Sequence, residues 1–190
     1  MLEDGVEAEY AKAVASYLSC TFDRMAMSHN TLTQWQVGYE KMGNMFPRQA
    51  LPMVWDYAEP NASSGTVRSW NELFKDTLNT LSHCSETRNN PATVIQSSAT
   101  NLPYSDNFID AILTDPPYYD NVPHSHLSDF FYVWLKRTVG HLYPDLFSTP
   151  LTPKSNEIVA YSNIEGGFEA GKQYFEDMLK KNPFRRSIVC

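Results

Sequence analysis

The sequence Ile-Leu-Thr-Asp-Pro-Pro-Tyr at residues 112–118 constrains the chain more than any other stretch. Residues 112–114 are typical of the end of a buried strand, and the two prolines must stop that strand, because proline has a fixed φ and no N–H group. Asp115 and Pro116 each precede a proline and are therefore biased toward extended geometry. The stretch predicts a stiff loop at the carboxyl end of a strand, where open α/β sheets bind ligands.

This loop offers hydrogen-bond acceptors and almost no donors. The Asp115 carboxylate and a backbone carbonyl can each accept one hydrogen of an amino group, and the Tyr118 ring can stack on a planar ligand. We therefore predict that the catalytic segment consists of Asp115, Pro116, Pro117 and Tyr118. The next three residues are predicted to contact the substrate: Tyr119, Asp120 and Asn121.

The spacing of apolar residues predicts four amphipathic helices, at residues 5–27, 67–81, 125–138 and 168–181. In the first helix the recurring positions are Val6, Tyr10, Val14, Tyr17, Leu18, Thr21, Phe22 and Met25. Ser63 or Ser64 is expected to cap the second helix and Ser125 the third, which Gly140 would end.

Two short apolar runs predict strands, at residues 93–96 and 109–114, while residues 36–50 and 141–160 are expected to be irregular. This order of helices and strands is typical of an α/β domain with a parallel sheet. We expect one partial domain, in which residues 1–90 are the helical part, 91–140 the strand–loop–strand core, and 141–190 an insertion followed by a truncated helical end. Because two strands make a marginal sheet, we expect a fragment of a larger protein.

Composition limits the function classes. With a formal net charge of −7, the chain is expected to bind a polyanion poorly. A nucleic-acid substrate would therefore need phosphate contacts from outside this chain. The three cysteines form no close pair and are typical of free thiols in a reducing compartment. The acidic N-terminus does not resemble a signal peptide, and no apolar run could span a membrane, so we predict a cytoplasmic protein. His124 and His126, with Asp120 and Asp129 nearby, could bind a metal, but no cysteine cluster accompanies them and the pair flanks an expected helix cap, so no metal site is predicted.

Residues 10–175 resemble the central part of the large adenine-specific DNA methylases of prokaryotes, some of which carry a zinc ribbon and an N-terminal domain of unknown function. The matching segments are residues 48–59, 110–122, 127–137 and 151–154. Many amino-methyltransferases share the D-P-P-Y motif, whereas the aromatic segment that follows it, Leu-Ser-Asp-Phe-Phe-Tyr-Val-Trp-Leu-Lys-Arg, is more specific.

The resemblance implies a Rossmann-like, class I methyltransferase fold that binds S-adenosylmethionine and methylates the N6 amino group of a flipped adenine in DNA. Residues 115–118 take the D-P-P-Y role. Ser98 and Ala99 lie where related enzymes contact the cofactor adenine, although the turn reads Ser-Ser-Ala here in place of Gly-Asp-Ala. The chain has eight glycines and no G-x-G, so the family's glycine-rich cofactor turn is missing. We therefore expect the chain to be inactive alone and to need the remaining parts of a full-length methylase.

Two other functions stay open at this point. The same loop chemistry serves any planar amino group, so the substrate class also includes RNA or a protein amide. The missing glycine-rich turn favours a different hypothesis, in which the chain is a non-catalytic remnant or a regulatory module.

Overall fold

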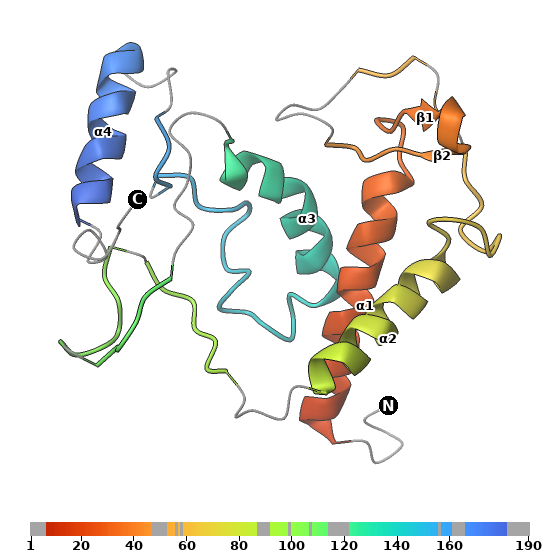
Figure 1. Cartoon of the computed structure of the whole chain (residues 1–190), viewed down its shortest axis with the longest axis horizontal. Helices are drawn as coiled ribbons and strands as arrows, with labels where there is room; N and C mark the ends of the chain where they lie inside the picture. Colours follow the sequence, from red (N-terminus) through yellow and green to blue (C-terminus); the bar gives the residue numbers. More distant parts are fainter. Residues whose placement is uncertain are drawn as a thin grey trace. The chain divides into compact units, whose positions relative to one another are not determined.

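The computed structural model describes residues 7–46, 53–55, 57, 59–86, 92–98, 100–106, 108–113, 122–155, 157–160 and 166–181. Within these residues the chain is mainly helical (Figure 1). The helices are α1 (Ala8–Ser28), α2 (Trp70–Ser85), α3 (His124–Thr138) and α4 (Gly167–Lys181). Two short strands, β1 (Trp35–Gln36) and β2 (Lys41–Met42), flank a single turn of 3-10 helix, η2 (Val37–Tyr39).

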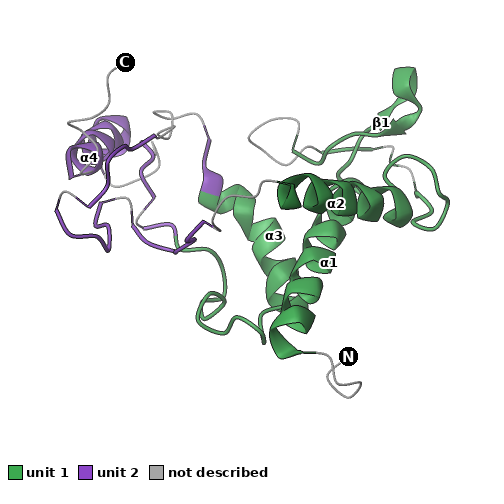
Figure 2. Cartoon of the chain, turned by 60° about the horizontal axis from the view of Figure 1, so that its bottom comes forward, with its two compact units in different colours: residues 1–89, 125–153 green, residues 90–124, 154–190 purple. Residues whose placement is uncertain are grey.

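The chain divides into two compact units, coloured separately in Figure 2. Unit 1 comprises Met1–Asn89 and Ser125–Pro153, and unit 2 comprises Asn90–His124 and Lys154–Cys190. Each unit is therefore built from two separate stretches of sequence, and the chain passes between the units three times.

In unit 1, helices α1 and α2 meet through polar side chains. Thr21 is fully buried, and its Oγ1 lies 2.8 Å from Oγ1 of Thr77. Leu73 adds an apolar contribution from α2, with 5% of its surface exposed. Near the solvent edge Arg24 and Asp76 form an ion pair of 3.4 Å, a type of exposed pair that adds little stability.

Helix α3 brings aromatic rings to the core of unit 1. Trp134 meets Phe22 of α1 edge to face, with the ring centroids 5.5 Å apart. Phe46 lies 5.9 Å from both Phe130 and Phe131. These edge-to-face arrangements are the preferred geometry of aromatic pairs and add stability beyond the area they bury.

The segment after α3 is irregular and is held to the helix by hydrogen bonds. Tyr132, which is 9% exposed, donates its hydroxyl to the carbonyl oxygen of Thr149 at 2.7 Å. The Thr152 hydroxyl lies 2.6 Å from Oδ1 of Asp129 and from the carbonyl oxygen of Ser125. This segment has no partner strand, and its polar groups form hydrogen bonds with α3 instead.

Unit 2 has a smaller core among its described residues. Phe175 of α4 is 6% exposed, and Val159 and Ala160 are each 3% exposed. The hydroxyl of Tyr174 donates to the carbonyl oxygen of Ser155 at 3.0 Å. Tyr104 and Phe108 stack on each other with centroids 5.2 Å apart.

The existence of the four predicted helices is confirmed, but Ser125 is the second residue of α3 and not its N-cap as predicted. Helix α1 ends as predicted before His29, α3 ends at Thr138 just before Gly140, and α4 begins one residue earlier than expected. The start of α2 was predicted wrongly: the helix begins at Trp70, and its N-cap is Ser69, not Ser63 or Ser64. The prediction that residues 36–50 are irregular is also wrong in part, because most of the hairpin formed by β1, η2 and β2 lies within this range.

The predicted α/β fold, a partial Rossmann-like class I S-adenosylmethionine-dependent methyltransferase fold with a parallel sheet and extra helices, is wrong. The sheet among the described residues has two strands, which run antiparallel and pair Trp35 with Met42 and Gln36 with Lys41. Residues 93–96 and the described part of 109–114 form no strand; nearby there is a single bridge between Ser98 and Asn101. Apolar character alone does not make a strand, because a strand needs a neighbour for its hydrogen bonds and a layer to cover its side chains. Val94 is 90% exposed and Leu113 98% exposed, so neither has such a layer.

The buried face of α1 also differs from the apolar face that the sequence predicts. Its buried residues are Ser19, Thr21, Asp23, Ala26 and Ser28. Two members of the expected face, Tyr10 and Tyr17, are 62% and 47% exposed. Three of the small polar residues can be buried because their hydroxyls donate to backbone carbonyls of the preceding turn: Ser19, Thr21 and Ser28.

Candidate functional site

The predicted catalytic and substrate-binding residues lie outside the described part of the chain. This applies to Asp115, Pro116, Pro117 and Tyr118, and equally to Tyr119, Asp120 and Asn121. The described residues next to this segment are Leu113 before it and Val122 after it. Helix α3 then begins at His124, whose N–H donates to the carbonyl oxygen of Val122 at 2.9 Å.

Of the two predicted cofactor-binding residues, Ser98 is described and Ala99 is not. Ser98 is exposed, and its Oγ lies 2.8 Å from Oγ1 of Thr100 and accepts the Thr100 N–H at 3.2 Å. Its carbonyl oxygen accepts the N–H of Asn101 at 3.1 Å. The hydroxyl therefore serves a local turn, and the assignment of Ser98 and Ala99 to the cofactor stays a prediction.

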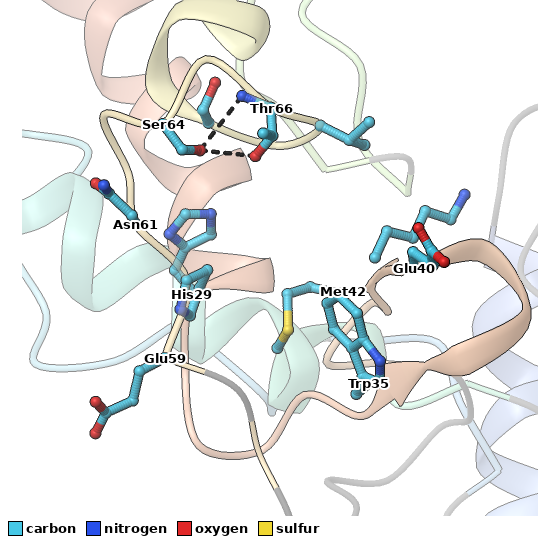
Figure 3. A pocket seen from close by; sticks show the side chains of 12 residues that line it. His29, Trp35, Glu40, Met42, Glu59, Asn61, Ser64 and Thr66 are labelled. Atoms are coloured by element: carbon cyan, nitrogen blue, oxygen red, sulfur yellow. Dashed lines mark hydrogen bonds between the residues drawn. The ribbon is translucent and has the colours of Figure 1, made fainter.

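A pocket of about 370 Å³ lies in unit 1, beside the hairpin and the segment that leads into α2 (Figure 3). Trp35 and Met42 lie together on one side, His29 and Asn61 on another, and Ser64 and Thr66 along a third. Further lining comes from Lys41 and Val67 and from Ser69, the N-cap of α2. The volume lies within the range of small-molecule sites.

Ser69 gives this pocket a specific polar feature. The residue is 1% exposed, and its Oγ has no hydrogen-bond partner. Its backbone is extended, with φ −67° and ψ 163°, as an N-cap residue requires, yet the hydroxyl makes no capping bond. An unpaired buried hydroxyl of this kind is destabilising by about 1–3 kcal/mol.

The backbone just before Ser69 is held in an uncommon conformation. Arg68 has φ +66°, in the left-handed region that disfavours side chains with a Cβ. The carbonyl oxygen of Arg68 accepts a hydrogen bond from Nε2 of His29 at 2.8 Å, and its guanidinium donates to Oδ1 of Asn44 at 2.8 Å. Burial and the nearby Arg24 lower the pKa of Arg68. Two hydrogen bonds thus fix the turn that places Ser69.

A buried carboxyl group lies elsewhere in unit 1, on α1. Asp23 is 8% exposed, and its Oδ1 has no hydrogen-bond partner. Burial raises the pKa of Asp23 to about 7 from an ordinary value of 3.8. Burial, followed by the charge of Asp23, also raises the pKa of the Cys20 thiol one turn earlier.

Sequence reasoning missed the pocket, although one signal was present. Residues 69–72 read Ser-Trp-Asn-Glu, which is the pattern of a capping box in front of an apolar helix. That pattern marks Ser69 as the cap more directly than Ser63 or Ser64. No comparable pattern marks His29 or Trp35, because they reach the pocket only through the tertiary fold.

No cluster of three or more metal-ligating side chains occurs in the described ranges of the chain. Among the helices that the structure describes, none has the length and apolar character needed to cross a bilayer.

Comparison with protein-family models, with curated proteins and with solved structures found no match to this chain.

Proposed function

We propose that this chain contributes the amino-binding segment of an N6-adenine methyltransferase that acts on DNA with S-adenosylmethionine as methyl donor. The observation that carries the proposal is the sequence of residues 112–118. It offers several hydrogen-bond acceptors and almost no donors, which suits an NH₂ group on a planar ring. The aromatic segment that follows supports it, since α3 forms where the resemblance requires a helix. The proposal rests on these segments and not on a parallel sheet.

The chemistry assigned to this chain is binding and orientation. Asp115 and the Pro116 carbonyl each accept one hydrogen of the adenine amino group, which favours a pyramidal nitrogen with an available lone pair. Tyr118 stacks on the flipped base, with Tyr119 as a second stacking residue. Catalysis of this kind depends on positioning and on acceptors placed where positive charge develops.

The proposal also includes a partner, because the sequence has no glycine-rich cofactor turn and unit 2 leaves apolar side chains uncovered. Val94, Phe108 and Leu113 are 90%, 64% and 98% exposed. Exposed apolar side chains mark an interaction surface where they form one contiguous patch, and we propose that these three belong to such a patch. We assign that role to the remaining parts of a full-length methylase, which would also hold the methyl donor.

The test is binding of single-stranded oligonucleotides that carry one adenine or one N6,N6-dimethyladenine. We expect the chain to prefer the unmethylated base, because the dimethyl form has no amino hydrogen to donate. Asp115→Ala should remove the preference, whereas Asp110→Ala, at an exposed position five residues earlier, should keep it. Equal binding of the two oligonucleotides by the unaltered chain would refute the proposal.

A second assay addresses the need for a partner. Incubation of the chain with labelled S-adenosylmethionine and unmodified DNA should give no methyl transfer. Robust turnover by the chain alone would contradict the assignment of the methyl-donor site to a partner.

A non-catalytic regulatory module is the second candidate, and the absence of any G-x-G in the sequence favours it. Calorimetric titration of the chain with S-adenosylhomocysteine, together with the oligonucleotide assay, separates the two candidates. A regulatory module would show neither the amino-group preference nor heat of binding. An amino-binding segment would show the preference with or without that heat.

A further inference from the structure

A second pocket of unit 1, of about 420 Å³, is formed by the C-terminal part of α1, the first turns of α2 and residues around β2. Its lining includes three cationic and two acidic side chains: Arg24, Lys41, Arg68, Glu72 and Asp76. The volume suits a small molecule, and the presence of both signs of charge limits which kind it can be.

Three of these charges already have a partner in the protein. Arg24 and Asp76 form an ion pair of 3.4 Å. The ammonium of Lys41 lies over the Tyr39 ring, 5.0 Å from its centroid, in a cation–π contact. The remaining charges of the lining are therefore one cation and one carboxylate.

The two remaining charges are those of Arg68 and Glu72. Neither has a charged or aromatic partner within the part of the chain that the structure describes. The Arg68 guanidinium donates to Oδ1 of Asn44 at 2.8 Å, which is a neutral acceptor, and keeps further N–H donors. Glu72 is exposed in the first turn of α2. The pocket thus presents a donor for an anion and an acceptor for a cation.

The guanidinium extends from a fixed turn, which reduces the entropy lost when it holds a ligand. Arg68 has φ +66°, and its carbonyl oxygen accepts a hydrogen bond from Nε2 of His29 at 2.8 Å. Burial, followed by the charge of Arg24, lowers the pKa of Arg68. A carboxylate beside this guanidinium would offset that repulsion, and guanidinium donors match a carboxylate in geometry.

The lining also includes apolar side chains. Leu73 is buried, Met27 is half-buried and Val67 is exposed. A thioether adapts to ligands of different shape, and an aliphatic group placed here would be partly removed from water. The ligand is therefore expected to combine both charges with an aliphatic part.

We propose that this pocket binds an aliphatic α-amino acid, with its carboxylate on Arg68, its ammonium on Glu72 and its side chain against Leu73. A zwitterion carries one charge of each sign, so it pairs both groups and adds no net charge to the pocket. A simple acid or a simple amine would pair only one of them.

The test is calorimetric titration of the full chain with L-leucine and two of its analogues. Isocaproate lacks the ammonium group, and isoamylamine lacks the carboxylate. L-Leucine should bind with a Kd of about 1 mM or below, and each analogue should bind at least about tenfold more weakly, because one charged hydrogen bond is lost. Glycine, which has no aliphatic part, should also bind more weakly than leucine.

Variants then assign each charge. Glu72→Gln should weaken leucine binding about tenfold and leave isocaproate unchanged. Arg68→Gln should weaken leucine and isocaproate and leave isoamylamine unchanged. Thermal denaturation checks that both variants fold, and Glu72→Gln is expected to do so because Glu72 has no partner among the described residues. Glu86→Gln, an exposed glutamate at the other end of α2, is the matched control and should change nothing.

Three outcomes would overturn the proposal. The first is absence of leucine binding up to about 10 mM. The second is binding of isocaproate or isoamylamine as tight as that of leucine, which would mean that the pocket recognises one charge only. The third is unchanged leucine affinity in Glu72→Gln with a preserved thermal transition. None of these results bears on the amino-group preference assigned to residues 115–118, so the two proposals can fail separately.

Discussion

Thr21 and Thr77 share a hydrogen bond of 2.8 Å between their Oγ1 atoms, across the contact of α1 and α2. Each hydroxyl also lies 3.0 Å from a backbone carbonyl one turn earlier, that of Tyr17 and that of Leu73. Two hydroxyl protons therefore serve three contacts, so at most two of the three are true donations at any moment. The pair links the two helices by a polar contact at a place where most proteins use apolar side chains.

Replacing these threonines one at a time and together should reveal their coupling. We expect Thr21→Val to lower the free energy of unfolding by about 1–2 kcal/mol, because Thr21 is fully buried and its partner is left with a weaker network. The double variant with Thr77→Val should be less destabilised than the sum of the single variants. Urea denaturation measures all three, and Thr80→Val, an exposed threonine with a bond to its own helix, is the control. Additive effects would contradict a direct interaction.

Asp23 should make the stability depend on pH. Its folded-state pKa of about 7 lies above the ordinary 3.8, so between these values the folded chain keeps a proton that the unfolded chain releases. The contribution of this proton to stability is full below about pH 4 and is lost as the pH rises toward 7, by at most about 4 kcal/mol.

Asp23→Asn removes this titration. We expect the variant to be more stable than the unaltered chain above about pH 7 and to show a flatter pH profile in thermal denaturation. Asp145→Asn, at an exposed position, is the matched control and should leave the profile unchanged. If Asp23→Asn retained the full pH dependence, burial of this carboxyl would not be its cause.

The left-handed backbone of Arg68 predicts an unusual order of stabilities. At φ +66° glycine is less strained than alanine, so Arg68→Gly should be more stable than Arg68→Ala by about 1 kcal/mol. Both variants lose the bond to Asn44, so the comparison isolates the backbone. In helix α2 the order should reverse, with Lys75→Ala more stable than Lys75→Gly by about 1 kcal/mol. The same order at both positions, measured by urea denaturation, would contradict the backbone assignment.

The uncovered apolar residues of unit 2 predict substitutions without a stability cost. Leu113→Ser should change the free energy of unfolding by less than about 0.5 kcal/mol, because the side chain is 98% exposed. It should also reduce binding of a hydrophobic dye. Leu73→Ala, at a position 5% exposed, should cost about 2–5 kcal/mol in the same assay. A large loss of stability in Leu113→Ser would mean that another part of the chain covers this residue.

The helices could be predicted from sequence and the sheet could not, for a physical reason. The hydrogen bonds of α1, α3 and α4 lie within each helix, so the 3.6-residue pattern and local end signals suffice to place them. Residues 93–96 have the apolar character of a strand, but the bonds of a strand lie with a neighbour that sequence spacing does not identify. The hairpin at Trp35 shows the reverse case, since its short strands pair across a tight turn within an expected loop.

The two candidate sites also differ in how far they could be predicted from the sequence. The D-P-P-Y chemistry can be inferred from sequence because four consecutive residues carry it, and it stays a prediction. The pocket at Ser69 could not be inferred, because His29, Trp35 and Ser69 meet only after α1, the hairpin and α2 have packed. The 3.6-residue pattern likewise does not predict which side chains of α1 are buried, because Asp23 is buried and Tyr10 is exposed.

The alternation of the two units along the sequence has a practical consequence for dissecting this protein. A single cut near residue 90 would separate α1 from the Trp134 ring that packs on Phe22, and a cut near residue 154 would divide unit 2. Neither unit can therefore be isolated by shortening the chain from one end. Genetic separation would need a linker that joins residue 89 directly to residue 125, or a rearranged order of the gene segments.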